Sequence, residues 1–160
     1  MERLDQTLRS KQNNYLKSYV VVLRKFLNKL HILQGLLPLP ILWSGLAQYM
    51  QKHHYEIMLG CASIPMGDGG HFAASLYNSL SNEQIAPVEN HAFPRLPLPL
   101  DRLNGGLEVE PPPLIKGYLK LGAKICSAPA WDPDFNTADV LTMLRLSEIN
   151  PRYAKHFLGL

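Results

Sequence analysis

The sequence predicts an α/β fold in which helices and strands alternate. Residues 41–54 carry apolar side chains at helical spacing, residues 55–61 alternate as a strand does, and residues 138–146 are almost continuously apolar. A helix that leads through a short connection into a strand is half of a βαβ unit. At 160 residues the chain is long enough to bury one core.

Residues 4–33 are expected to form a helix, because apolar side chains recur there at spacings of three and four. Residues 1–31 hold seven lysines and arginines against two acidic residues. A core-facing helix with a solvated basic face and a helix lying on anionic lipid both fit this pattern. The apolar run 19–23 has neither the length of a membrane span nor a following cleavage site, so neither a span nor a signal peptide is expected. We therefore divide the chain into a basic N-terminal helix, 1–36, and a main unit, 37–160.

Prolines at 38 and 40 are expected to end the first helix, and a second helix over 41–54 then precedes the strand 55–61. The loop 63–71 leads into a helix over 71–80. Its glycines are compatible with a phosphate cradle or with ordinary turn chemistry. The turn is favoured, because the lysine and the glycine spacing of known phosphate loops are absent from it.

Residues 86–113 contain seven prolines and should run in extended form over the surface. Four leucines in this segment need burial: Leu96, Leu98, Leu100 and Leu103. A short helix is expected over 113–123, which begins with proline and has glycine near its end. Strands are expected over 124–129 and 138–146. In the tail, Asn150 is suited to cap a last helix with Pro151 at its first position.

Composition excludes several kinds of site. A net charge of +3 is too small to indicate a nucleic-acid partner. Cys61 and Cys126 lie far apart without metal-ligand spacing, which argues against a disulfide framework or a zinc site and favours a reducing, cytoplasmic setting. Cys61 is expected to be a packing residue. No metal site is expected among the histidines, which lack ligand spacing: His53, His54, His71 and His91.

Four stretches give the chain a recognisable signature. They are "ILWSGLAQYM", "GCASIP", "PPPLIKGYLKLGAKICSAPAWDPDFNTADVLTMLRL" and "INPRYAKHF". Together they resemble the GNAT-type N-acyltransferases that include the ornithine-lipid N-acyltransferases and the related, often "hemolysin-like", N-acyl amino acid synthases. The resemblance covers about residues 41–158, and "LIKGYLKLGA" and "DPDFNTADV" are its most specific parts.

The resemblance implies a GNAT-like (acyl-CoA N-acyltransferase-like) mixed sheet flanked by helices. It also implies transfer of a fatty (3-hydroxy)acyl group from an acyl-carrier-protein or coenzyme A thioester to the amine of an amino acid such as ornithine, for aminolipid synthesis. No bound cofactor is implied. An acyl carrier protein and the amino acid would be partners, and the enzyme would be cytoplasmic, either free or peripheral to the inner membrane.

The positions before residue 41 depart from the family pattern. The glycine-arginine strand and the glycine-rich phosphate loop of that family are not found there, so the chain resembles the C-terminal half of the catalytic domain without its early strands. Two functions therefore stay open. One is an active N-acyltransferase, and the other is an inactive, truncated acyltransferase-like module that binds at a membrane surface.

Acyl transfer to an amine needs a neutral amine, a stabilised oxyanion and a proton for the leaving thiolate. Carboxylates at the mouth of a buried strand can pair with a cationic amino acid and accept its proton. Asp139 is the catalytic candidate of this kind, and Asp134 and Asn136 are the substrate-binding candidates. The alternative is that the same residues only form a turn.

Three further candidates lie on predicted helices. By resemblance, Tyr77 occupies the helix on which many GNAT enzymes carry a tyrosine that protonates the leaving thiol; a packing role is the alternative. Tyr118 and Lys116 lie in the best-matched helix and are substrate-binding candidates. Lys116 would meet a carrier-protein phosphate or an acidic lipid surface, or else it lies in solvent.

Overall fold

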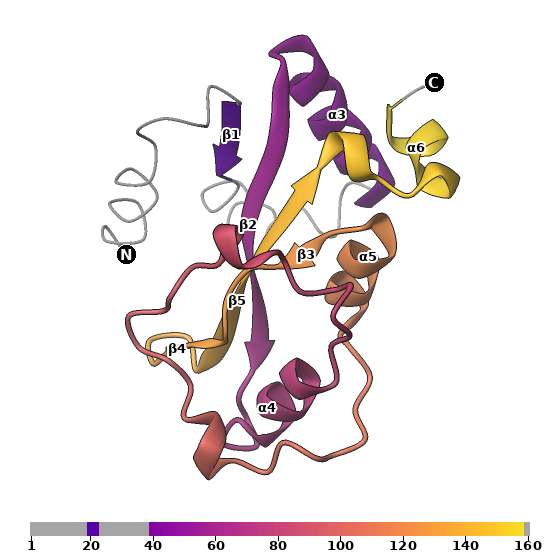
Figure 1. Ribbon diagram of the computed structural model, residues 1–160. Coiled ribbons are helices and arrows are strands. Elements are labelled where there is room, and N and C mark those ends of the chain that lie inside the picture. Colours follow the sequence, from indigo (N-terminus) through magenta and orange to yellow (C-terminus); the bar gives the residue numbers. More distant parts are fainter. Residues whose placement is uncertain (1–18, 23–38, 159–160) are drawn as a thin grey trace.

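The computed structural model of the 160-residue chain describes the backbone of residues 19–22 and 39–158 and the side chains of residues 45–154. Its centre is an antiparallel pair of long strands, β2 (Tyr55–Pro65) and β5 (Thr137–Arg145). The pairing runs from Ile57 opposite Arg145 to Pro65 opposite Thr137. Figure 1 shows β2 running through the middle of the molecule with β5 beside it.

Three short strands complete the sheet. β1 (Tyr19–Val22) pairs in parallel with β2, and its register ends at Val22 opposite Leu59. β3 (Lys124–Ile125) and β4 (Ala130–Asp132) both pair antiparallel with β5. The sheet therefore combines parallel and antiparallel pairs, and the predicted mixed sheet flanked by helices is confirmed.

Four α-helices are described: α3 (Leu39–Lys52), α4 (His71–Asn78), α5 (Pro113–Leu121) and α6 (Pro151–Leu158). Three short 3-10 helices lie in the connections: η1 (Val88–Asn90), η2 (Leu100–Arg102) and η3 (Leu146–Glu148). The helices predicted over 41–54, 71–80 and 113–123 and at the C-terminal end are confirmed within two residues. Among the described residues no helix has both the length and the apolar composition needed to cross a membrane.

The two faces of the sheet are covered differently. On the helix face, Ala138 and Val140 of β5 and Ile64 of β2 belong to a core to which all four helices contribute side chains. On the other face, the smaller core around Leu141 contains Ala86 of the long connection between α4 and α5. We call this second side the strap face, and residues 86–98 the strap. No α-helix of the described segments contributes a buried side chain to the strap-face core.

The helix predicted over 4–33, and with it the helical assignment of 1–36, is wrong at residues 19–22. These residues, Tyr-Val-Val-Val, form β1, because β-branched side chains favour extended backbone once a partner strand is available. The rest of 4–33 lies outside the described residues. A strand upstream of β2 is therefore present.

The strand predicted over 124–129 is also wrong beyond Ile125. The N–H of Leu141 on β5 donates to the Ser127 hydroxyl at 3.0 Å, and so does not bond a backbone carbonyl of this segment. Pro129 has no N–H with which to continue a ladder. Cys126 still donates its N–H to Leu141 O at 2.7 Å, and the regular ladder with β5 resumes at Ala130, in the unpredicted strand β4.

Candidate functional site

A cavity of about 430 Å³ opens on the strap face beside the β4–β5 hairpin. We call it the hairpin cavity. Its walls are mostly apolar and come from β2, the strap, the segment around β4, and β5. The lining residues are Cys61, Ala92, Phe93, Pro94, Arg95, Leu96, Ser127, Ala130, Trp131, Asp132, Pro133, Asp139 and Leu141.

The strap is fixed beside residues 126–131 by intermittent backbone hydrogen bonds. Ala92 donates to Cys126 O at 2.7 Å, and Leu98 donates to Pro129 O at 2.8 Å. Trp131 donates in return to Leu96 O at 2.8 Å. The bonds lie on both sides of residues 93–95, so this short stretch arches along the cavity between two fixed points.

Asp139 is the carboxylate best placed for chemistry in the hairpin cavity. It lies on β5 and is half-buried. One of its oxygens accepts a hydrogen bond from the Thr137 hydroxyl at 3.0 Å. Within the described residues its other oxygen has no hydrogen-bond partner, so the carboxylate keeps acceptor capacity for a ligand.

Asp132 is the second carboxylate on the cavity wall, and it closes the hairpin turn. Its Oδ1 accepts the N–H groups of Asp134 at 3.1 Å and of Phe135 at 3.3 Å. This is the side-chain-to-backbone bonding with which aspartate stabilises turns. Asp132 therefore supplies negative charge to the cavity while one of its oxygens is already engaged.

Asp134 and Asn136 shape the hairpin and do not line the cavity. Both are exposed. Asn136 adopts a left-handed conformation with φ of 52°, which asparagine tolerates better than most residues. Its carbonyl accepts the N–H of Met66 at 3.1 Å. The turn interpretation of these two residues therefore agrees with their surroundings.

Tyr77, Tyr118 and Lys116 lie away from the hairpin cavity. Tyr77, on α4, is half-buried against the helix-face core. Tyr118, on α5, is buried in that core, and burial raises its pKa to about 12. Lys116 is exposed and pairs with Glu110 at 3.3 Å. The structure thus groups Asp139 with Asp132, and it places these three candidates on other surfaces.

In the glycine-rich loop before α4, a carboxylate of the loop itself accepts the N–H groups at the helix N-terminus. Asp68 accepts the N–H of Gly70 at 3.0 Å and that of Phe72 at 2.6 Å. Desolvation acts to raise the pKa of Asp68, but these two hydrogen bonds, a third from its own backbone N–H and the nearby His71 outweigh it and hold the pKa below its ordinary value. A carboxylate bonded to the helix N-terminus would repel a phosphate. The loop is therefore a turn capped by Asp68 and does not have the free N–H groups of a phosphate cradle.

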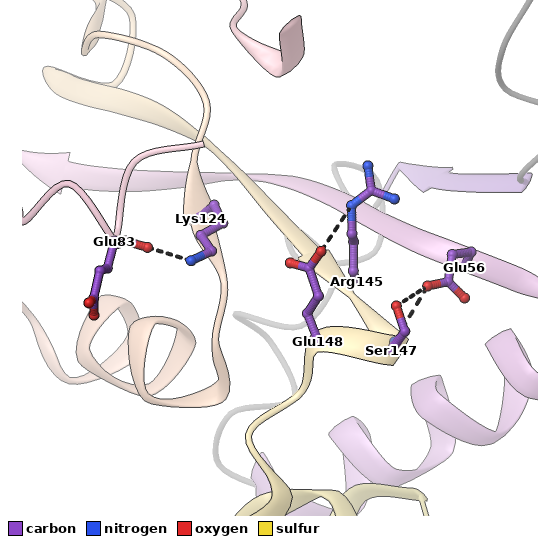
Figure 2. A network of polar contacts seen from close by, with 6 residues as sticks. All are labelled: Glu56, Glu83, Lys124, Arg145, Ser147 and Glu148. Atoms are coloured by element: carbon purple, nitrogen blue, oxygen red, sulfur yellow. Dashed lines mark hydrogen bonds and ion pairs between the residues drawn. The ribbon is translucent and has the colours of Figure 1, made fainter. Parts of the chain in front are cut away.

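A second cavity, of about 480 Å³, lies farther along the strap face beside Lys124 and Arg145, whose polar contacts are drawn in Figure 2. Its cations are already engaged. Lys124 Nζ donates to Glu83 O, and Arg145 Nε lies 3.6 Å from Glu148 Oε1. Within the described part of the chain, no three histidine, cysteine, aspartate or glutamate side chains gather closely enough to hold a metal ion.

Sequence reasoning assigned no site role to three residues of the hairpin cavity. Asp132 carried a signal, because it belongs to the same Asp-Pro-Asp turn as the candidate Asp134. Cys61 was expected to be only packing, yet it lines the cavity and is half-buried. Arg95 carried no signal, since the proline-rich strap has no periodicity that assigns a side chain to a face.

Comparison with known proteins gives matches to curated sequences alone. No protein-family model matches the chain, and no solved structure matches it. An L-ornithine N(alpha)-acyltransferase of Agrobacterium fabrum (strain C58 / ATCC 33970) is 36% identical over 129 residues, which are 74% of this chain and 43% of the relative. The proteins of the same name from Brucella abortus (strain 2308) and Rhizobium meliloti (strain 1021) are 29% and 30% identical, each over 73% of this chain. These alignments cover 44% and 42% of the respective relatives, so the chain spans less than half their length.

Proposed function

The chain belongs to the family of the L-ornithine N(alpha)-acyltransferases, and from this premise we propose that it acts in N-acyl transfer to ornithine. The donor is a fatty acyl thioester of an acyl carrier protein or of coenzyme A, and the acceptor is the α-amine. The product is an N-acyl amino acid for aminolipid synthesis. The hairpin cavity is the acceptor site.

One observation carries this proposal. The hairpin cavity combines apolar walls with the carboxylates of Asp139 and Asp132. Ornithine has a short aliphatic stem between cationic amines, and such a molecule needs apolar contact along the stem and negative charge at an amine. The residues that supply the negative charge belong to "DPDFNTADV", one of the two most specific stretches of the family signature.

The reaction requires one bond to form and one to break. The neutral α-amine attacks the thioester carbonyl carbon, an N–C bond forms, and the C–S bond breaks to release a thiolate. The amine nitrogen loses a proton and the thiolate gains one. In our proposal Asp139 holds the acceptor ammonium and receives the proton that it must lose, using the oxygen not bonded to Thr137.

The thioester is proposed to approach along the edge of β2 beyond the end of β1. β1 pairs with β2 only as far as Leu59, and within the described chain no other strand pairs with β2 residues 60–65 on that edge. A donor there would have access to both faces of the sheet. On this route Tyr77, which lies on the helix face, is proposed as the proton donor to the leaving thiolate.

The carrier protein is proposed to approach α5. Lys116 is exposed there and offers a cation for a phosphate group, although Glu110 already pairs with it. An exposed ion pair of this kind costs little to separate. Replacing Lys116 with alanine should raise the KM for an acyl-carrier-protein donor and leave the KM for ornithine unchanged.

The test is direct conversion. The purified chain is incubated with ornithine and either a long-chain acyl-carrier protein or the matching acyl-coenzyme A, and the amide-linked product is measured by mass spectrometry. Product above a heat-killed control supports the proposal and identifies the donor. No product with either donor, over a range of acyl lengths, would refute catalysis by this chain.

Membrane contact is a second candidate, and exposed aromatic residues favour it. Around the hairpin cavity, Phe93 is 81% exposed, Phe135 69% and Trp131 42%. Exposed aromatic side chains near loop tips are suited to the interface between water and lipid. Co-sedimentation with lipid vesicles tests it: binding that weakens when Phe93 and Phe135 become serine supports contact, and unchanged binding contradicts it.

A further inference from the structure

The hairpin cavity contains charges of both signs that do not neutralise each other. Arg95 is the single cationic side chain among its lining residues, and Asp132 and Asp139 are the carboxylates. No ion pair joins Arg95 to either carboxylate within the part of the chain that the structure describes. Because Arg95 is exposed on the strap, its guanidinium is accessible to a ligand.

The second cavity of the strap face shows the opposite arrangement. There Arg145 is paired with Glu148, and the Lys124 ammonium is bonded to a backbone carbonyl (Figure 2). Both cations of this cavity are thus engaged by groups of the protein itself. A ligand would have to displace those contacts, whereas at the hairpin cavity Arg95 and one oxygen of Asp139 have no partner among the described residues.

We propose that Arg95 binds the α-carboxylate of the acceptor while Asp139 binds its α-ammonium group, so that the hairpin cavity selects amino acids over simple amines. This inference rests on the proposed function. A zwitterion supplies one charge of each sign on a small molecule, as the cavity requires. The planar guanidinium is suited to a carboxylate because it can donate two parallel hydrogen bonds.

Backbone hydrogen bonds fix the position of Arg95 beside the cavity. The strap is fixed on one side of Arg95 by Ala92 bonded to Cys126 O, and on the other by Leu96 O bonded to Trp131. Asp139 lies on β5, which is paired along its length with β2. The two charged groups therefore come from separately anchored elements, so the neighbouring α-carboxylate and α-ammonium can be bound together while the methylene stem contacts the apolar walls.

Cys61 provides a readout of ligand binding that needs no acyl donor. It lines the hairpin cavity and is half-buried, whereas Cys126 is 1% exposed and burial raises the pKa of its thiol to about 11. N-ethylmaleimide should therefore modify Cys61 first, and a ligand in the cavity should slow that modification. Peptide mass spectrometry follows the two thiols separately.

The comparison uses ornithine and 1,4-diaminobutane, which lacks the carboxylate. Ornithine should protect Cys61 at a concentration at least about tenfold lower than diaminobutane, since one charge-assisted bidentate pair contributes that much to affinity. Arg95→Gln should raise the half-protecting concentration of ornithine about tenfold and leave that of diaminobutane unchanged. Arg102→Gln is the matched control, because Arg102 is an exposed arginine on η2 outside the cavity and should leave both values unchanged.

Equal protection by the two ligands, or an equal loss for both in Arg95→Gln, would overturn the assignment of Arg95. Absence of protection by either ligand would overturn the cavity as the acceptor site, and calorimetric titration with the same ligands makes that result independent of thiol reactivity. Ornithine-selective protection without any acylated product would refute the proposed catalysis while supporting Arg95. Product formation without selectivity would refute Arg95 alone.

Discussion

Replacing Asp139 with asparagine isolates the charge that the proposed acceptor site depends on. The amide oxygen of asparagine can still accept the Thr137 hydroxyl, which now donates to Asp139 at 3.0 Å, so the β4–β5 hairpin should keep its shape. A hydrogen bond to a charged group contributes about 1.5–3 kcal/mol and a neutral one about 0.5–1.5 kcal/mol. The loss of about 1–2 kcal/mol corresponds to an increase of roughly 5- to 30-fold in the KM for ornithine. The kcat should fall as well, because the asparagine amide cannot receive the proton that the acceptor amine loses.

Asp134→Asn is the matched control, because it removes the same charge from the same hairpin. Asp134 is exposed and lies outside the hairpin cavity, so only screened, long-range attraction is lost and the KM should change by less than about twofold. Both variants are assayed by steady-state acyl transfer with varied ornithine, and urea unfolding checks that they are folded. If Asp134→Asn raises the KM as much as Asp139→Asn does, the reasoning from cavity geometry is refuted.

Two further predictions concern stability. Gly122→Ala should lower the free energy of unfolding by about 1–2 kcal/mol, because Gly122 has φ of +99° and a Cβ there would lie 2.8 Å from Glu148 O. Gly117→Ala, on α5, should raise the free energy of unfolding by up to about 1 kcal/mol, because a Cβ at Gly117 would have nothing within 4 Å. Urea unfolding that ranks the two variants in the other order would contradict this. Burial raises the pKa of Tyr118 to about 12 from 10.0, so the unfolded chain releases this proton first, and the free energy of unfolding should fall by about 2 kcal/mol between pH 10 and pH 12. Tyr118→Phe should lack that part of the fall, and identical pH profiles for the two proteins would refute the assignment.

The spacing of apolar residues was enough to predict those helices and strands whose pattern allowed one interpretation. The alternation over 55–61 predicted β2, and proline at the start and glycine at the end predicted α5. β1 was missed because Tyr19–Val22 lies within a run of helically spaced apolar residues, and its extended conformation depends on pairing with β2, far along the chain. β4 has only three residues and depends on the hairpin that returns to β5, so no pattern within it could indicate a strand.

A site residue could be predicted where an unusual residue type marked its strand, and could not be predicted where tertiary packing determined its position. Asp139 was found because a carboxylate at the start of a buried strand is unusual. On α5, the spacing of Ile115, Tyr118 and Leu121 places Tyr118 in the core. Lys116 lies outside that stripe and faces solvent, so membership of one helix did not bring the two residues to one site. Arg95 reaches the cavity through the tertiary path of the strap.

The prolines of the strap explain how the hairpin cavity exists beside a sheet. A regular strand laid along residues 126–131 would donate an N–H at every second residue, and its alternate side chains would fill the strap face. Pro94 and Pro97 have no N–H to donate, so the strap is bonded only intermittently and leaves room beside β5. Proline also fixes its own φ and restricts the residue before it. Arg95 therefore lies in a stretch whose backbone has lost much of its freedom before any ligand arrives, which lowers the entropic cost of ordering its guanidinium against a carboxylate.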